Sequence, residues 1–437
     1  MYNELENRRN QNLRQGGEPD MKKIVLLLTA ALCLALWMMM PAAAEEGTEE
    51  PALESQGFRY RVLEDGTAEI LQYTGRNLYP SLPESLDGHP VTSIGDEAFY
   101  HPRFSVANVI IPATVRHIGS NAFSKTDLIE IEIPAGVISM GDNPFSYCES
   151  LKAITVAEGN PVFYAENGVL FCREDHSLVA FPNPAEIFEE NVYDDDDEDE
   201  YEGRSVTYTV PAGTEIIRAD AFGGVEGLTE VLFPDSLRVI GSQAFGFCFG
   251  LEKLTIPDSV TEIGNAAFDT CTYLGRVVLP RGLKRIPSML FYECENLYEA
   301  EIPETVTEIG DSAFEFCGSL EHVRIPDGVT KIETGVFEGC SSLRSIVIPE
   351  RVTEIGAFAF CGCDILTDVQ IPDTVTKIGE YAFSQCMSLK ELTVPDSVQV
   401  IGEHTFDYCS KELVILCGPD SPTKTYCEQN GIAFRTE

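Results

Sequence analysis

Residues Glu301–Val323 read EIPETVTEIGDSAFEFCGSLEHV, and this stretch is one unit of a repeat that fills most of the chain. One proline per unit recurs nine times at steps of 23 residues, at Pro211, Pro234, Pro257, Pro280, Pro303, Pro326, Pro349, Pro372 and Pro395. A phenylalanine keeps the same step at Phe222, Phe245, Phe268, Phe291, Phe314, Phe337, Phe360, Phe383 and Phe406, and three looser units upstream carry Phe99, Phe123 and Phe145. A fixed period of about 20 to 50 residues is typical of a solenoid.

The start of each unit is predicted to be a strand. In Leu320–Pro326, apolar Val323 and Ile325 alternate with polar residues, which indicates a strand with one buried face. Pro326 has no N–H to donate and would end this strand. One such coil cannot bury its own apolar side, whereas stacked coils bury each other's.

The second half of the unit is predicted to turn twice. The pair Ile309-Gly310 predicts a turn, because glycine accepts positive φ without steric cost. The following stretch, Asp311–Cys317, is interpreted as a short helical turn.

The unit pattern I-P-x-x-V-T-x-I-G-x-x-A-F-x-x-C-x-x-L resembles the leucine-rich repeat of the BspA-like bacterial surface-protein family, over residues 58–434. This resemblance implies a right-handed, strand-rich leucine-rich-repeat solenoid with 23-residue coils. It also implies a bacterial surface or secreted protein that adheres to host or microbial protein. Departures affect single coils: Pro287 and Glu333 replace the turn glycine, and Gly224-Val225 stands where one cysteine would be.

The N-terminal segments are predicted to serve export. Residues 1–20 are polar and aperiodic, and are interpreted as a misassigned or untranslated start. Residues 21–44 combine a basic start, an apolar run and a small-residue cleavage site, which predicts a signal peptide cut after Ala44. An uncleaved membrane anchor is the alternative. Residues 45–57 form a polar linker.

The repeats are predicted to lie between two caps and to be interrupted once. Residues 58–88 are predicted to be an N-terminal β-hairpin cap with its turn at Asp65-Gly66, before looser repeats over 89–150. Regular repeats occupy 207–410. The C-terminal cap, 411–437, is predicted to contain a helix over Thr423–Gln429 and a strand over Ile432–Phe434.

Residues 151–206 are predicted to be a β-meander insert with an acidic loop. Short strands are expected at Val162–Ala165, Val169–Cys172 and Leu178–Phe181, and NPVFYAENGVLFCREDHSLVAFP resembles an insert of the same family. The stretch Glu189–Glu202 holds ten carboxylates in 14 residues, which favours a solvated loop. A calcium site is the alternative, although the spacing of a calcium-binding loop is missing from this stretch.

The charge of the chain excludes polyanionic partners. The formal net charge is −41, and removal of residues 1–44 leaves 25 Lys and Arg against 67 Asp and Glu, or −42. So acidic a protein repels nucleic acid and anionic membrane surfaces. We therefore expect no nucleic-acid partner and no membrane contact after signal cleavage.

Nine of the 14 cysteines keep the repeat step and are predicted to be buried free thiols: Cys148, Cys248, Cys271, Cys294, Cys317, Cys340, Cys363, Cys386 and Cys409. Parallel Cβ vectors in stacked coils disfavour disulfides between them. In the C-terminal cap, a bond between Cys417 and Cys427 stays open as a way to hold the end of the stack. The pair Cys361 and Cys363 is too closely spaced for a zinc pair.

Catalysis and cofactors are not predicted. The six histidines are scattered without ligand spacing: His89, His101, His117, His176, His322 and His404. The sequence contains no nucleophile elbow, phosphate loop or metalloprotease helix. We therefore expect a protein that is not an enzyme and that has neither a cofactor nor a metal site.

The outward positions of the predicted strands form the candidate binding surface. Stacking brings neighbouring coils within about 5 Å, so these side chains form one patch, and solenoids bind along such a face. The patch mixes basic, acidic and apolar groups at Lys253, Arg276, Val278, Glu299, Glu301, His322, Arg324 and Val347. An ordinary solvated sheet face is the alternative interpretation.

Together with the resemblance, these features predict a secreted or cell-surface protein that binds an extracellular or host protein along its sheet face. A structural spacer or self-associating scaffold without a specific ligand is the second hypothesis, and a secreted enzyme with its site in the insert is the third. The oligomeric state is left open.

Overall fold

The computed structural model describes residues 52–100, 105–183 and 206–436. Two units divide the chain, Met1–Pro51 and Ala52–Glu437, and the second holds all of the described residues. The predicted start region, the signal peptide, the first part of the linker and the acidic stretch Glu189–Glu202 lie outside the described residues. Within the described ranges, no helix is long and apolar enough to cross a membrane.

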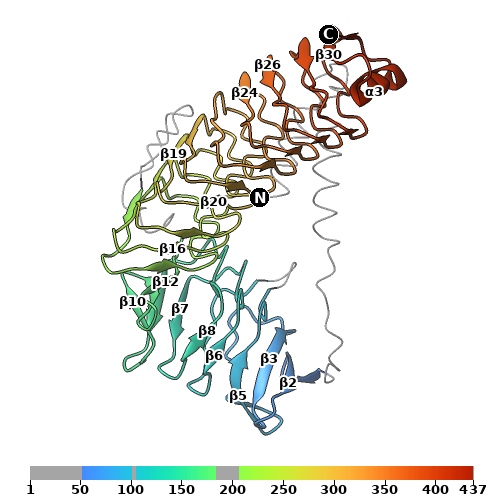
Figure 1. Ribbon diagram of the computed structural model, residues 1–437. Helices are drawn as coiled ribbons and strands as arrows, with labels where there is room; N and C mark the ends of the chain where they lie inside the picture. The colour runs from blue at the N-terminus through green and yellow to red at the C-terminus, as the bar shows by residue number, and fades with distance from the viewer. Residues whose placement is uncertain (1–51, 101–104, 184–205, 437) are drawn as a thin grey trace, which may run out of the picture. The chain divides into compact units, whose positions relative to one another are not determined.

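The coils of the regular repeat build two sheets, and each coil except that of His322 adds one strand to each (Figure 1). Pairing is parallel, and Arg276 lies opposite Lys253 on one side and Glu299 on the other, a step of 23 residues each way. The predicted solenoid of 23-residue coils is confirmed. The main sheet consists of β13 (Thr207–Thr209), β15 (Glu230–Leu232), β17 (Lys253–Thr255), β19 (Arg276–Val278), β21 (Glu299–Glu301), β24 (Ser345–Val347), β26 (Asp368–Gln370), β28 (Glu391–Thr393), β30 (Val414–Cys417) and β31 (Phe434–Thr436). The minor sheet consists of β14 (Ile216–Ile217), β16 (Val239–Ile240), β18 (Glu262–Ile263), β20 (Arg285–Ile286), β22 (Glu308–Ile309), β23 (Lys331–Ile332), β25 (Glu354–Ile355), β27 (Lys377–Ile378) and β29 (Val400–Ile401).

The N-terminal coils have the same two-sided plan with antiparallel strands at their start. One sheet contains β1 (Leu53–Ser55), β2 (Phe58–Val62), β3 (Ala68–Tyr73), β4 (Ser85–Leu86), β5 (His89–Ile94), β6 (His117–Ile118) and β8 (Ser139–Met140). The other pairs β7 (Glu130–Ile133) with β9 (Ala153–Val156). The hairpin of β2 and β3 closes through a hydrogen bond that the Gly66 N–H donates to the Leu63 carbonyl, at 2.8 Å.

A column of phenylalanine rings occupies the centre of the stack. Rings from Phe222 to Phe406 follow one another at centroid distances of 4.5 to 6.0 Å, and most are completely buried. Offset ring pairs at this spacing are favourable in addition to the area that they bury. The repeated phenylalanine of the sequence is therefore the core of every coil.

The nine cysteines that keep the repeat step, here called the column thiols, each donate a hydrogen bond to a phenylalanine carbonyl of the preceding coil. The Cys317 Sγ lies 3.2 Å from the Phe291 oxygen, and all nine column cysteines make the same bond at 3.1 to 3.3 Å. All are free thiols, as predicted. Burial raises the pKa of the Cys248 thiol to about 12, so it remains a protonated donor.

The predicted helical turn over Asp311–Cys317 is wrong. This stretch is a series of turns in which Ser312 and Phe316 adopt left-handed φ values of 56° and 59°. That conformation directs their N–H groups at the next coil, where they bond the carbonyls of Thr334 and Glu338 at 2.9 and 2.7 Å. A helix would have used these donors within the coil, whereas here bonds to the next coil alternate with short bonds within the coil, such as that from the Glu315 N–H to the Ser312 carbonyl.

The prediction that the Ile-Gly pair needs glycine for a positive φ is also wrong. Gly310 and Gly379 have no positive φ; instead, a Cβ on Gly310 would lie 2.5 Å from the backbone nitrogen of Ser288, and one on Gly379 would lie 2.4 Å from that of Ala357. Glycine is therefore required because the preceding coil passes too close for any side chain.

Three units of the regular repeat lack this glycine, with Arg218, Pro287 and Glu333 in its place, and the last two coincide with breaks in the minor sheet. Pro287 directly follows β20 and Glu333 directly follows β23, and the sheet divides between β18 and β20 and again between β22 and β23. Gly310 donates its N–H to the Ile286 carbonyl of the preceding coil. Pro287, at the equivalent position one coil earlier, has no N–H to donate. The coils of Pro287 and Glu333 therefore lose pairing with the preceding coil without ending the stack, whereas β14, which Arg218 follows, pairs on both sides.

The main sheet is interrupted in the coil that contains Leu320–Pro326, the stretch for which a strand was predicted. A bridge between Glu299 and His322 joins this stretch to β21. Pairing resumes between β24 and β26 and divides once more before β28. Val323, which we predicted to be buried in a strand, is half-buried and lies outside any strand. This coil is also the one in which Glu333 replaces the close-contact glycine.

The segment predicted as an insert lies within the stack. It consists of β10 (Phe163–Glu166), β11 (Val169–Cys172) and β12 (Ser177–Ala180), which pair antiparallel before β12 pairs parallel with β14. All residues of β11 and β12 are buried. One side, including Leu170 and Val179, packs into the core of the N-terminal coils, and the other, including Phe171 and Leu178, packs into the core of the regular coils. The meander is thus a wall between two cores.

The C-terminal end contains one helix and a last strand. Helix α3 (Pro422–Asn430) begins at Ser421, whose side chain accepts from the Lys424 N–H, and ends at Gly431 with φ 68°. The predicted strand over Ile432–Phe434 is instead β31, two residues further along. Cys417 and Cys427 are both buried free thiols.

Three acidic side chains follow column phenylalanines and are withdrawn from water. Burial raises the pKa of Asp269 and of Glu315 to about 7. For Glu338, burial and the neighbouring Glu315 raise the pKa to about 8. A Cβ on Gly335 would lie 3.2 Å from Oε2 of Glu315 and 3.6 Å from Oε2 of Glu338, which places the two carboxyl groups beside one another. Among the described residues, none of the three acids forms an ion pair.

Gly379→Ala should lower the free energy of unfolding by about 1 to 3 kcal/mol, because the new methyl group would overlap the backbone of the preceding coil. Gly282→Ala is the matched control, since nothing lies within 4 Å of its Cβ position. Chemical denaturation measures both. Equal stability of the two variants would contradict the close-contact explanation.

Stability should fall as the pH rises from about 4.5 to about 8. The three buried acids bind protons more tightly in the folded chain than in the unfolded chain across this window, so raising the pH favours unfolding. Each pKa shift exceeds one unit, which corresponds to about 1 kcal/mol or more. Thermal unfolding should show a lower midpoint at pH 8.5 than at pH 5.

The double variant Glu315→Gln with Glu338→Gln should flatten this pH dependence, because it removes two of the titrating groups. The exposed Glu262→Gln serves as the control and should leave the dependence unchanged. A double variant with the full wild-type slope would show that the pH dependence has another origin.

Candidate functional site

The outward face of the main sheet carries the predicted site residues. On β17, β19 and β21 the central residues Leu254, Val277 and Ala300 are buried, and the residues on either side of them point outward and are exposed or half-buried. Register between the strands places like positions opposite one another, so Val278 faces Glu301. The eight predicted residues therefore share one face, although the break after His322 divides it.

The charge of Arg276 is compensated by its own chain. Its Nε lies 3.0 Å from a carboxylate oxygen of Glu299, and its Nη2 lies 2.9 Å from one of Glu301. Hydrogen bonding to Glu301, with the charge of Glu299, raises the pKa of the guanidinium further. Arg276 is thus part of a cross-strand ion-pair network.

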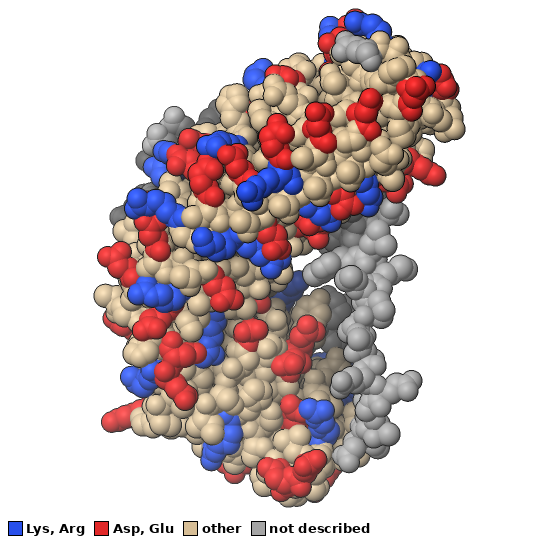
Figure 2. Space-filling view, viewed as in Figure 1, with Lys and Arg blue, Asp and Glu red and all other residues tan. Residues whose placement is uncertain are grey.

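Arg324 is compensated in the same way. It pairs with Glu304 from the preceding coil, and with Asp327 at 3.9 Å. On the face seen in Figure 2, basic side chains likewise lie next to acidic ones over most of the stack. The sequence therefore overstated the positive charge of this face, because pairing between coils cannot be read from composition.

Two hollows lie where the main strands end. The first has a volume of about 560 Å³ and extends from Thr255 to Glu304, with Val278, Leu279 and Ile302 among its lining. The second, of about 380 Å³, lies at the sheet break between His322 and Pro349. Because Glu304 lines the first and Arg324 lines the second, their ion pair bridges the two hollows.

The structure separates the predicted residues into two groups. Five of them line the hollows: Val278, Glu301, His322, Arg324 and Val347. The other three, Lys253, Arg276 and Glu299, stand in the first outward column and do not line either hollow. Val347 is the most exposed of the apolar members, at 63%.

Sequence reasoning missed Tyr298. Its ring lies against Gly275, since a Cβ there would be 2.9 Å from the ring, and the side chain is half exposed beside Arg276. Aligning the units could have indicated this contact. Gly275 stands where the neighbouring units have Glu252 and Tyr298, and a glycine there leaves room for the Tyr298 ring. Aromatic side chains of this kind are enriched at binding hot spots.

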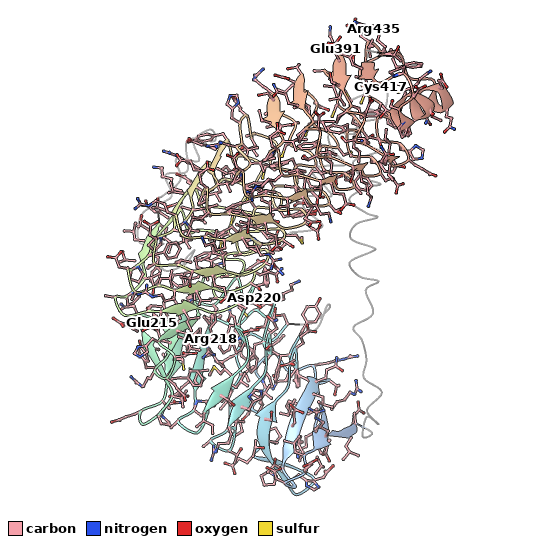
Figure 3. The ribbon with its side chains drawn as sticks, viewed as in Figure 1. Glu215, Arg218, Asp220, Glu391, Cys417 and Arg435 are labelled. Atoms are coloured by element: carbon pink, nitrogen blue, oxygen red, sulfur yellow. The ribbon has the colours of Figure 1, made fainter. Side chains whose placement is uncertain are left out.

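The polar cluster at the meander is structural. Arg218 donates to Asp175 at 2.7 Å and to Ser177 at 2.8 Å, which joins the meander to the regular coils; Figure 3 labels Arg218 there. At the other end, Arg435 reaches across β30 to Glu391 at 3.4 Å (Figure 3). Over the ranges that the structure describes, no group of three or more His, Cys, Asp or Glu side chains could hold a metal ion.

The repeat matches a known family profile. The profile described as "BspA type Leucine rich repeat region (6 copies)" covers residues 87–196, 201–321 and 307–427. No curated protein sequence matches the chain.

Solved structures of three bacterial leucine-rich proteins are similar to the chain. A leucine-rich repeat protein from Bacteroides ovatus ATCC 8483 is 24% identical over 88% of this chain and 99% of its own, with a TM-score of 0.46. One from Eubacterium ventriosum ATCC 27560 is 17% identical over 82% and 94%, with a TM-score of 0.45. A leucine rich cell surface protein from Faecalibacterium prausnitzii A2-165 is 21% identical over 69% and 95%, with a TM-score of 0.40.

Proposed function

The chain belongs to the BspA-type leucine-rich-repeat family, and from that premise we propose that it is a non-enzymatic protein-binding module of a secreted or cell-surface bacterial protein. The partner is an extracellular or host protein that lies along the outward face of the main sheet. The family supports the surface location, and the export segment predicted over residues 21–44 agrees with it.

The paired hollows are the observation that carries this proposal. They lie side by side on one exposed face, and their lining combines apolar side chains with ion pairs. An exposed apolar surface with a polar rim is typical of protein interfaces. A partner side chain placed against Val347 would bury an apolar group that now meets water.

The ion pairs change what the arginines contribute. Because Arg276 and Arg324 are each compensated, long-range attraction of an acidic partner is a small part of the binding. Their role is to fix the shape of the rim, and contact with Val278, Val347 and Tyr298 supplies the affinity. Reversing either arginine would also place like charges together on the chain itself, which makes charge reversal a poor test.

Val347→Asp should weaken binding to the partner at least about tenfold, because it puts a charge where an apolar group is buried in the complex. Stability should barely change, since Val347 points into water in the free protein. The measurement is binding of the chain to a panel of extracellular-matrix and mucin proteins, followed by titration of whichever protein binds.

Val400→Asp is the matched control, because Val400 is also an exposed strand valine, 52% exposed, but lies on the minor sheet. It should bind like the wild type. Equal affinity of wild type and Val347→Asp would exclude the main-sheet face, and a panel without any binding protein would favour the scaffold hypothesis.

A further inference from the structure

A third hollow lies on the outward face of the N-terminal coils, outside the surface proposed above. It has a volume of about 560 Å³ and is formed by the stretch around Ile110 together with β7 and β9. Its lining includes Ile110, Ala113, Glu130, Glu132, Ala135 and Thr155. We refer to it as the N-terminal hollow.

The N-terminal hollow is bordered by exposed apolar side chains. Ile110 is 66% exposed. Its N–H donates to the Pro80 carbonyl of the adjacent coil, and Tyr79 directly precedes Pro80. Tyr79 is 63% exposed, and Leu78 and Ile129 are also exposed. Such a concentration of large apolar groups on one small surface is unusual outside an interface.

The charged groups of the hollow are acidic and have no salt-bridge partner within the described part of the chain. Glu130 and Glu132 are both exposed on β7, and neither joins an ion pair with any other described residue. Arg116 donates instead to the backbone carbonyls of Ala113 and Val115, and Lys152 already has a partner. This differs from the main-sheet face, where Glu299, Glu301 and Glu304 are all paired with arginine.

We propose that the N-terminal hollow binds an extended segment of a partner protein in which a large apolar side chain stands next to Lys or Arg. The apolar group would rest on Ile110 and the two alanines, while the cation would meet Glu130 and Glu132. Opposite charge across an interface fixes register and speeds association. Apolar burial then holds the segment in place.

The net charge of the chain favours such a partner over a second copy. A second copy would bring the same net charge of −41 to an already acidic surface. The meander also separates the core under this hollow from the core under the main-sheet face. The two surfaces can therefore be altered independently.

The test uses the full chain and two labelled 12-residue peptides, one of alternating Lys and Leu and one of alternating Glu and Leu. Fluorescence anisotropy should show binding of the Lys-Leu peptide, weakened by added salt, and much weaker binding of the Glu-Leu peptide. Glu130→Gln with Glu132→Gln, and separately Ile110→Ser, should each weaken binding of the Lys-Leu peptide at least about tenfold.

Asp368→Asn with Asp373→Asn is the matched control, because it removes two exposed acids from another part of the stack. It should bind the Lys-Leu peptide like the wild type, and so should Val347→Asp, which separates this surface from the one proposed above. The inference is overturned if the wild type does not bind, if the Glu-Leu peptide binds equally well, or if the control loses as much affinity as the Glu130 and Glu132 variant. Unchanged melting temperatures would show that every variant is folded.

Discussion

The close spacing of neighbouring coils is the constraint on which the rest of the structure depends, and the hydrogen bond from each column thiol to a phenylalanine carbonyl is one consequence of it. This bond requires a small donor beside the ring of the preceding coil, and only a coil that lies very close can supply it. The same closeness explains the glycine that follows most minor strands, because Gly379 leaves no room for a Cβ beside Ala357. It also explains the left-handed turn residues, whose N–H groups point along the stack and not around the coil. Ring stacking, thiol bonding and backbone bonding therefore depend on a single spacing between coils.

One hollow of the exposed surface coincides with a departure from the repeat, although the spacing between coils is kept there. Glu333 takes the place of a close-contact glycine, the minor sheet divides before β23, and the same coil leaves the main sheet after His322. The smaller main-sheet hollow lies at this point. The larger main-sheet hollow lies where β17, β19 and β21 pair without a break, so hollows form on regular coils as well. The N-terminal hollow belongs to the looser units upstream of the meander, where β7 and β9 pair along their whole length.

The sequence predicted the periodic features and missed those that depend on contact between coils. A step of 23 residues was enough to place the phenylalanine column, the free thiols and the outward columns, since each follows from position within a unit. The conformation of Ser312 and Phe316 could not be predicted in this way, because their left-handed φ is stabilised by bonds to the next coil. The pairing of Arg276 with Glu299 and Glu301 likewise joins residues that lie one coil apart. The positions of the meander strands were predicted, but their burial on both faces was not. Alternation of apolar and polar residues does not distinguish strands packed between two cores from an insert at the side of the stack.

Differential alkylation of the cysteines, read by mass spectrometry, tests the packing of the column most directly. The chain is treated with an alkylating reagent under native conditions, then unfolded and treated with a second reagent of different mass. Because each column thiol is enclosed and donates to a carbonyl, all nine should carry only the second label, with Cys409 the first to react on longer exposure since it alone is half-buried. Native labelling of Cys294, Cys317 and Cys340 at the rate of an exposed thiol, or their recovery as disulfides, would contradict the stack of close coils on which the rest of the structure depends.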